Sequence, residues 1–105
     1  GLWAQWRPEE AGGGLRAAGE SVLLSCRGSN GTFEAYTVRW YRQSPGGSLE
    51  WVSSISYSGS VKKYGAAVEG RATASRDSYQ SQSALSLWAL HPRDSARYFC
   101  TFATD

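Results

Sequence analysis

Turn-forming residues divide this chain of 105 residues into short segments along most of its length. The segments between the turns are rich in β-branched and aromatic residues, which favour strands. Short strands separated by such turns are typical of an all-β sandwich or barrel. A helical fold is not expected, because no window of about eleven residues keeps the apolar period of about 3.6 residues that a helix requires. The turn clusters are Gly12-Gly13-Gly14, Ala18-Gly19-Glu20, Ser29-Asn30-Gly31, Pro45-Gly46-Gly47, Tyr57-Ser58-Gly59 and His91-Pro92-Arg93-Asp94.

Apolar and polar residues alternate within several of these segments, which predicts strands with one buried face. Each apolar set contains a cysteine or a large apolar side chain. Two sheets that face each other across a common core are the simplest arrangement for such strands. The inward sets are Val22, Leu24 and Cys26; Val38 and Trp40; Ser83, Leu85 and Leu87; and Ala96, Tyr98 and Cys100.

Two cysteines and one tryptophan stand at informative spacings: Trp40 follows Cys26 by 14 positions, and Cys100 follows Trp40 by 60. Both cysteines lie on the inward faces of their predicted strands, so a disulfide between the two sheets is geometrically reasonable. A disulfide that closes a loop of about 75 residues would stabilise the fold by about 4–5 kcal/mol in the chain-entropy model. Trp40 would pack against this disulfide. With only two cysteines, the chain is neither a disulfide-dense mini-protein nor a zinc protein built on four thiolates.

Several stretches of the chain together resemble an immunoglobulin variable domain, in particular that of a heavy chain. The resemblance runs from about Gln5 to Phe102, and it implies an immunoglobulin V-type antiparallel β-sandwich with one inter-sheet disulfide, Cys26–Cys100. Tyr98, two residues before Cys100, stands at the tyrosine-corner position of such domains. The matching stretches are Gly12-Gly13-Gly14-Leu15, Leu24-Ser25-Cys26, Trp40-Tyr41-Arg42-Gln43-Ser44-Pro45-Gly46, Leu49-Glu50-Trp51-Val52-Ser53, Gly70-Arg71-Ala72-Thr73-Ala74-Ser75-Arg76-Asp77, and residues 94–100.

The same resemblance implies an ion pair between Arg71 and Asp94 at one end of the sandwich. The alternative is two solvated surface charges, which would contribute little to stability. The chain also departs from the family, because Ala74 and Ser83 stand where larger apolar side chains are usual. A looser lower core is therefore expected. Pro8 predicts that the first strand is an edge strand.

The two ends of the chain raise separate expectations. Residues 1–4 are the remnant of a leader, an added cloning sequence or part of the first strand, and residues 1–105 are expected to form a single domain. The joining segment that normally supplies the final strand is missing after Asp105. One edge of the strand at residues 96–101 would then lack a ladder partner, so we expect the working molecule to supply that strand. Residues beyond Asp105 are the favoured source, and a partner chain is the alternative.

An enzyme is not expected, and neither is a cofactor or a metal site. His91 is the single histidine, so Ser and Asp residues cannot be assembled into an acyl-transfer triad. Glu9, Glu10 and Asp77 show no spacing that demands acid–base catalysis. The net charge of +2 is too balanced to indicate nucleic acid or an anionic membrane as the main partner. No apolar run approaches the about 18 residues needed to span a bilayer.

The resemblance assigns antigen contact to three loops, at about residues 30–37, 54–63 and after Thr101. Tyr36 and Tyr57 offer rigid amphipathic area, and the serines offer adaptable polar contact. Without the resemblance, these residues would be no more than ordinary turn residues. The predicted contact residues are Gly31, Thr32, Glu34, Ala35, Tyr36, Thr37, Ser56, Tyr57, Ser58, Gly59, Ser60, Lys62, Ala103, Thr104 and Asp105.

Asn30 begins an Asn-Gly-Thr sequence in the first of these loops. This sequence is an N-glycosylation acceptor, and Asn-Gly is also a pair favoured in tight turns. Both interpretations can hold together.

A second surface follows from the strand alternation alone. Five residues would point away from the core on one sheet: Tyr41, Gln43, Leu49, Trp51 and Phe99. An apolar patch of this kind usually marks an interface. The resemblance implies that it docks a light-chain-like variable domain. Tyr41 departs from antibody heavy chains, which usually have Val there, and is more typical of T-cell receptor segments and of heavy chains that work alone.

The sequence therefore predicts an antigen-recognition variable domain of an adaptive immune receptor, extracellular and either attached to the cell surface or secreted. A heavy-chain-like T-cell receptor chain of the mu or delta kind is favoured over an antibody heavy chain or single-domain antibody. The favouring features are the Trp40-Tyr41-Arg42-Gln43 run and the unusual Trp88-Ala89-Leu90-His91 stretch. The alternatives are a V-set ectodomain of an adhesion or signalling receptor, and a subunit similar to the surrogate light chain that a partner strand completes.

Overall fold

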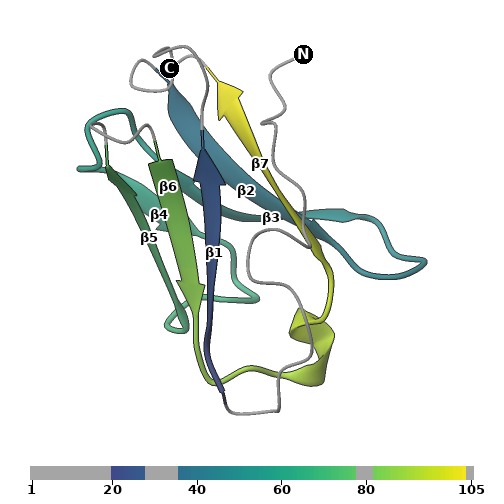
Figure 1. The fold of residues 1–105 in the computed structure, drawn as a ribbon. Coiled ribbons are helices and arrows are strands. Elements are labelled where there is room, and N and C mark those ends of the chain that lie inside the picture. Colours follow the sequence, from purple (N-terminus) through teal and green to yellow (C-terminus); the bar gives the residue numbers. More distant parts are fainter. Residues whose placement is uncertain (1–19, 28–35, 78–81, 104–105) are drawn as a thin grey trace.

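A computed structural model describes residues 20–27, 36–77 and 82–103 of the chain. These residues form two antiparallel sheets packed face to face (Figure 1). The prediction of an all-β sandwich with one inter-sheet disulfide is confirmed. The elements are β1 (Val22–Arg27), β2 (Thr37–Gln43), β3 (Leu49–Ile55), β4 (Lys62–Tyr64), β5 (Ala72–Asp77), β6 (Gln82–Leu87), the 3₁₀ helix η3 (Pro92–Asp94) and β7 (Arg97–Ala103).

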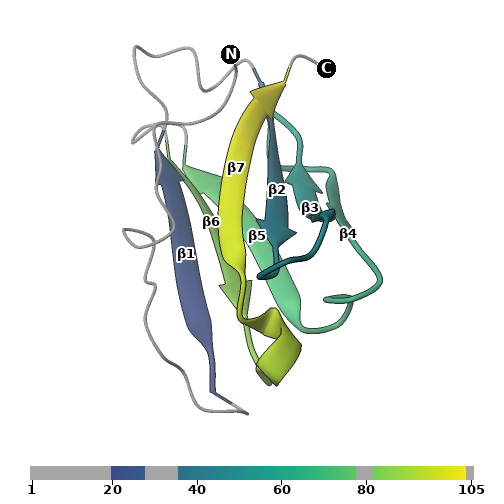
Figure 2. The ribbon, with the colours of Figure 1, turned by 90° about the vertical axis from the view of Figure 1, so that its right-hand side faces the viewer.

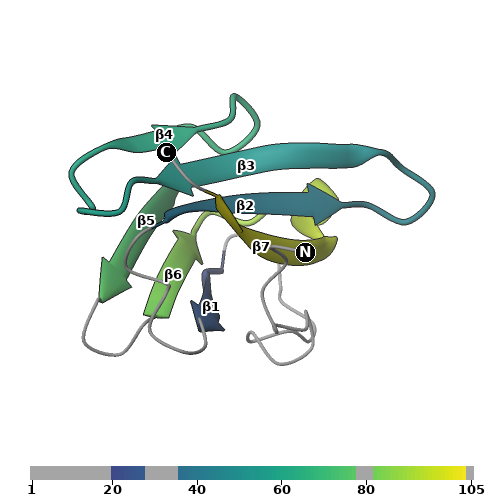
Figure 3. The same ribbon diagram turned by 90° about the horizontal axis from the view of Figure 1, so that it is seen from above.

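One sheet has the strand order β1-β6-β5 and the other has the order β4-β3-β2-β7. Figure 3 shows these two layers from above, with the core between them. Residues of the inward sets face each other in register, as in the pairs Val22–Leu87 and Leu24–Leu85. A slip of one residue would turn these side chains out to solvent, so burial of the apolar set specifies the pairing.

The disulfide between Cys26 and Cys100 joins β1 to β7 across the sandwich, with the two Cα atoms 6.4 Å apart. Trp40 pairs with Cys100 in the ladder between β2 and β7. All three side chains are buried, and Trp40 has no exposed surface. The arrangement agrees with the role that the Cys–Trp–Cys spacing implies.

Ala74 and Ser83 are both fully buried, at the positions where larger side chains were expected from the resemblance. The Ser83 hydroxyl donates a hydrogen bond to the carbonyl oxygen of Ser75 at 2.8 Å, which satisfies a polar group inside the core. Tyr64 reaches from β4 toward the same region, where its hydroxyl oxygen accepts a hydrogen bond from the Ala74 amide at 2.9 Å. Looser packing at this place stays a prediction.

A β-bulge interrupts the pairing of β2 with β3. Trp40 pairs with Ser53 while Tyr41 pairs with Trp51, so Val52 is an extra residue in β3. Val52 and Ser53 are consequently both buried. The bulge lets Trp51 face outward on one side of Val52 while Ile55 faces the core on the other.

In the described residues, β7 is an edge strand of its sheet, and the expectation that a further strand covers this edge stays a prediction. Several other predictions fall on residues outside the described ranges. These are the possible leader remnant at residues 1–4, Pro8, the glycosylation candidate Asn30, and the loop residues Gly31, Thr32, Glu34, Ala35, Thr104 and Asp105.

Candidate binding site

The start of β2, the end of β7 and the β3–β4 turn lie at one end of the sandwich, which we call the loop end. Thr37 pairs with Ala103, and Val38 pairs with both Phe102 and Ile55, so the strand register holds the three segments together. Figure 2 shows η3 at the opposite end of the sandwich. The described members of the three predicted loops thus meet on one surface.

The β3–β4 turn at residues 56–61 is tied together by its own serines. The Ser56 carbonyl accepts the Gly59 amide at 2.9 Å, and the Ser56 hydroxyl oxygen accepts the Val61 amide at 3.1 Å. The hydroxyls of Ser58 and Ser60 lie 2.8 Å apart. Gly59 has a φ of +82°, a left-handed conformation that favours glycine. The serines therefore fix the shape of the turn besides offering polar groups to a ligand.

Tyr57 is the side chain that this turn presents to solvent, with 60% of its surface exposed. Lys62 is exposed at the start of β4, and Tyr36 is half-buried before β2. Thr37 differs from the prediction: it is buried, with 7% exposed, because it begins β2 and pairs with Ala103. Its side chain is therefore not available to a ligand in this structure.

Arg76 on β5 connects the end of the first loop to the β3–β4 turn. Its Nη1 atom donates hydrogen bonds to the carbonyl oxygens of Tyr36 and Ser56, both at 2.7 Å. One carbonyl ends the first loop and the other begins the β3–β4 turn, so a single guanidinium sets their separation. This role of Arg76 was not predicted from the sequence. The signal was present, since Arg76 continues the inward set of Ala72 and Ala74 on β5.

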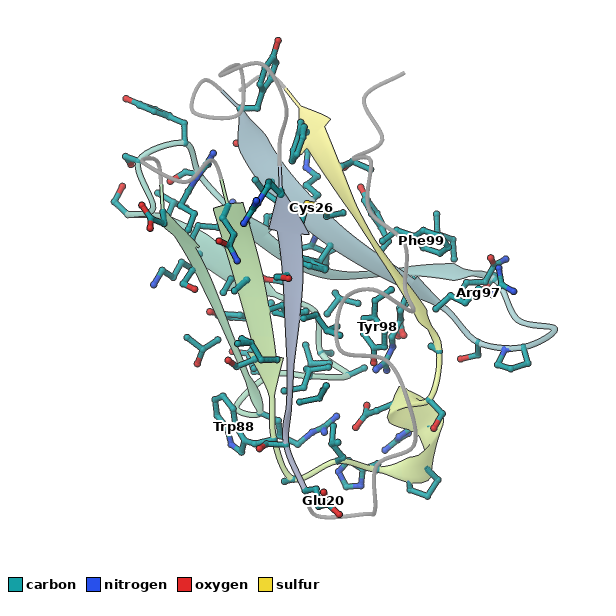
Figure 4. All side chains as sticks on the ribbon, viewed as in Figure 1. Glu20, Cys26, Trp88, Arg97, Tyr98 and Phe99 are labelled. Atoms are coloured by element: carbon teal, nitrogen blue, oxygen red, sulfur yellow. A yellow bond between two sulfur atoms is a disulfide. The ribbon has the colours of Figure 1, made fainter. Side chains whose placement is uncertain are left out.

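The outer face of the four-stranded sheet carries the second predicted surface, here called the aromatic face: Tyr41, Gln43, Leu49, Trp51 and Phe99. Ladder pairs bring these five residues together across β3, β2 and β7. Leu49 is 49% exposed and Trp51 is 37% exposed. The Trp51 indole N–H donates to the Ser54 hydroxyl at 3.0 Å, which fixes the ring on the surface. Figure 4 shows Phe99 on the outer side of the sheet and Tyr98 on the inner side.

A buried charge network closes the end of the sandwich opposite the loop end. Asp94 on η3 accepts hydrogen bonds from Arg42 and from Arg71, each at 2.8 Å, and from the His91 amide at 2.8 Å. The Asp94 side chain is only 4% exposed. Arg71 and Asp94 therefore form an ion pair, and the alternative of two solvated surface charges does not hold. Tyr98 donates its hydroxyl proton to the Asp94 carbonyl oxygen at 2.7 Å.

Electrostatics in this network follow from burial and hydrogen bonding. Burial alone would raise the pKa of Asp94, but hydrogen bonds from Arg71, the His91 amide and Arg42 lower it from 3.8 to about 2. Burial would lower the pKa of Arg42, and its hydrogen bonds with Glu50, Tyr98 and Asp94 raise it instead. Arg42 was not singled out in the sequence, although it too continues an inward set, after Val38 and Trp40 on β2.

A metal-binding cluster and a membrane-spanning helix are both absent from the part of the chain that the structure describes. Within residues 20–27, 36–77 and 82–103, no three His, Cys, Asp or Glu side chains are grouped so that they could hold a metal ion. In the same ranges, no helix is long and apolar enough to cross a membrane.

The two-sheet sandwich, the disulfide from β1 to β7 and the buried Trp40 define an immunoglobulin-type domain of the variable kind. A family model described as the immunoglobulin V-set domain matches residues 15–105. The chain belongs to the immunoglobulin V-set family. Domains of this family are in general recognition modules that bind protein partners.

Proposed function

We propose that this chain is the antigen-recognition variable domain of an adaptive immune receptor, with no catalytic role. The observation that carries the proposal is the construction of the loop end. A turn fixed by its own hydrogen bonds presents Tyr57, and Arg76 ties that turn to the base of the first loop. Residues 1–105 act in this proposal as one domain.

The rigidity of the turn supports binding, because a contact surface that is already ordered loses little conformational entropy when it meets a ligand. Tyrosine adds contact area at low entropic cost, and serine adds hydrogen-bonding groups. Tyr57, Ser58 and Ser60 are exposed at the loop end. Thr37 contributes to the framework instead.

Within this class we propose a receptor chain of heavy-chain type that pairs with another variable domain through the aromatic face. The exposure of Leu49 and Trp51 supports an interface, because adjoining apolar side chains are costly to leave in water. Leu49 and Trp51 resemble a conventional paired heavy chain. Tyr41 favours a T-cell receptor chain of the mu or delta kind over an antibody heavy chain or a single-domain antibody.

An extracellular location, on the cell surface or secreted, completes the proposal. The Cys26–Cys100 disulfide supports it, since structural disulfides persist in oxidising compartments. An N-linked glycan on Asn30 is part of the same proposal and would be checked by mass spectrometry with and without an N-glycosidase.

Sequencing transcripts from many individual cells tests the proposed function. A different junction after Asp105 in each cell is the expected result, because an antigen receptor must diversify its third loop. A single fixed continuation into a stalk would instead indicate the V-set ectodomain of an adhesion or signalling receptor. An immediate stop in every transcript would indicate a subunit similar to the surrogate light chain, completed by a partner strand. Either of these two results would overturn the proposal.

A further inference from the structure

Four outward-facing residues form a continuous row across the four-stranded sheet near the loop end. Thr101 on β7 pairs with Arg39 on β2, Arg39 pairs with Ser54 on β3, and Ser54 pairs with Lys63 on β4. Their outward direction follows from the alternation of the strands, because the neighbouring Trp40, Ser53 and Cys100 are buried. With adjacent strands about 4.8 Å apart, the row is about 14 Å long. We call it the basic row.

The basic row carries two cations without an anionic partner among the described residues. The three ion pairs in the described ranges all involve Arg42 or Arg71, at the other end of the sandwich. Strands β2, β4 and β7 contain no acidic residue, and the one acidic residue of β3, Glu50, is paired with Arg42. Arg39 is half-buried, so part of its solvation is already lost.

The polar groups beside Arg39 suit a carboxylate. Ser54 accepts the indole N–H of Trp51 at 3.0 Å, which leaves the hydroxyl proton of Ser54 free to be donated. The hydroxyl of Thr101 lies on the other flank of Arg39 in the register. A planar guanidinium between two hydroxyl donors matches the two oxygens of a carboxylate. Lys63 is exposed at the end of the row and adds a point charge that attracts a second acidic group.

We infer that the basic row binds an acidic side chain, Asp or Glu, of a protein ligand, with the carboxylate held by Arg39 between Ser54 and Thr101. This inference rests on the proposed function, since it names the chemistry of the ligand at the base of the loop end. The carboxylate has a second possible source, namely this chain itself. Glu34 and Asp105 lie outside the described residues, and the experiment separates them from an external ligand.

The test selects ligands for the oxidised 105-residue chain from a random peptide library displayed on phage. Selected peptides are then synthesised, with matched versions in which each Asp or Glu is replaced by Asn or Gln. Affinities are measured for the wild-type chain, for Arg39→Gln and for the control Arg97→Gln. Arg97 is exposed on the same strand as Thr101 but at the far end of the sheet, as Figure 4 shows. Melting temperatures are recorded for all variants, including Glu34→Gln and Asp105→Asn.

The expected result is that the selected peptides are enriched in Asp or Glu. Arg39→Gln or loss of the carboxylate should weaken binding by about tenfold or more, while Arg97→Gln changes it by less than about twofold. Binding should also weaken as salt rises from about 50 to about 300 mM, because the contact is ionic and partly exposed. The melting temperature of Arg39→Gln should stay within about 1 °C of wild type, as expected for a surface change that breaks no internal pair.

Three outcomes would overturn the inference. In the first, the selected peptides lack acidic residues and bind wild type and Arg39→Gln equally. This result would show that the basic row is not a carboxylate site, while recognition by the loops would still stand. A lower melting temperature for Arg39→Gln, matched by Glu34→Gln or Asp105→Asn, would show that the carboxylate belongs to this chain. A library that yields no ligand at all would count against the basic row and against the proposed function together.

Discussion

The guanidinium of Arg42 lies 2.8 Å from the carboxylate of Asp94, although the two residues are 52 positions apart in the chain. Both side chains are 4% exposed. Arg42 stands on β2 of the four-stranded sheet, and Asp94 stands on η3 in the connection from β6 to β7. The contact therefore fixes the crossover between the two sheets to β2, an inner strand of the larger sheet.

Replacing Asp94 is expected to cost far more than an exposed charge would. Asp94→Asn leaves Arg42 and Arg71 without their shared anion, and removal of one member of a buried pair costs about 3–5 kcal/mol. The free energy of unfolding, measured by chemical denaturation, should fall by that amount. Arg93→Gln on the same 3₁₀ helix is the control, because Arg93 is exposed. A loss below about 1 kcal/mol for Asp94→Asn would show that the network does not stabilise the fold.

The stability of the domain should decline in acid partly through the same carboxylate. The pKa of Asp94 is lowered from 3.8 to about 2 in the folded state, so the folded state favours the ionised form. The resulting stabilisation of about 2 kcal/mol is complete above the unfolded pKa and is lost as the pH falls from about 5 toward 2. Denaturation at a series of pH values should show this decline for wild type. The curve for Asp94→Asn should be flatter by the same amount, and parallel curves would contradict the assignment.

A charge placed at Trp51 should weaken association without changing stability. Trp51→Glu puts a carboxylate into the aromatic face, where a partner variable domain or a second copy would have to bury it. Light scattering should detect a smaller fraction of the associated species, whether that is a complex with the partner domain or a dimer of this chain. The free energy of unfolding should change by under about 1 kcal/mol. Trp88→Glu is a matched control, because Trp88 is 40% exposed and lies beside the other sheet (Figure 4). Equal association of wild type and Trp51→Glu would mean that this face binds no partner.

Removing the guanidinium of Arg76 should loosen the loop end before it affects the core. Arg76→Ala takes a hydrogen-bond donor from the carbonyls of Tyr36 and Ser56. The amides of Gly59 and Val61, which Ser56 holds, should then exchange with solvent about tenfold faster or more. Arg27→Ala at the end of β1 serves as the control, because Arg27 is exposed. Unchanged exchange in both variants would show that the turn holds its shape without Arg76.

Alternation indicated two facing sheets and made the disulfide geometrically reasonable, because Cys26, Trp40 and Cys100 belong to clear inward sets, and the resemblance then implied the V-type sandwich. Alternation failed for Arg42 and Arg76, which occupy inward positions but are charged. Their burial depends on partners far away in the chain, such as Asp94, and no local pattern contains that information. The rule that charges face solvent holds only where no such partner is supplied.

The loop end and the aromatic face were predicted from the resemblance and from the strand pattern, and their residues were placed with different success. Tyr57 and Trp51 are exposed as expected. Thr37 was assigned to the end of a loop and also to the start of a strand, and it lies in β2, where it pairs with Ala103 and is buried. The residue at which a strand begins or ends depends on the neighbouring strand with which it pairs, and a single sequence does not identify that strand.

Val52 sets the phase of β3. Ahead of it, odd-numbered residues such as Trp51 face solvent, and beyond it the odd-numbered Ile55 faces the core. Deleting Val52 would remove the bulge and restore regular alternation, with Trp51 still facing solvent and Ile55 still facing the core. The cost of that deletion would be the loss of the buried Val52 side chain from the core. Because Val52 and Ser53 both face inward, the bulge places Trp51 of the aromatic face and Ser54 of the basic row on the same side of the sheet.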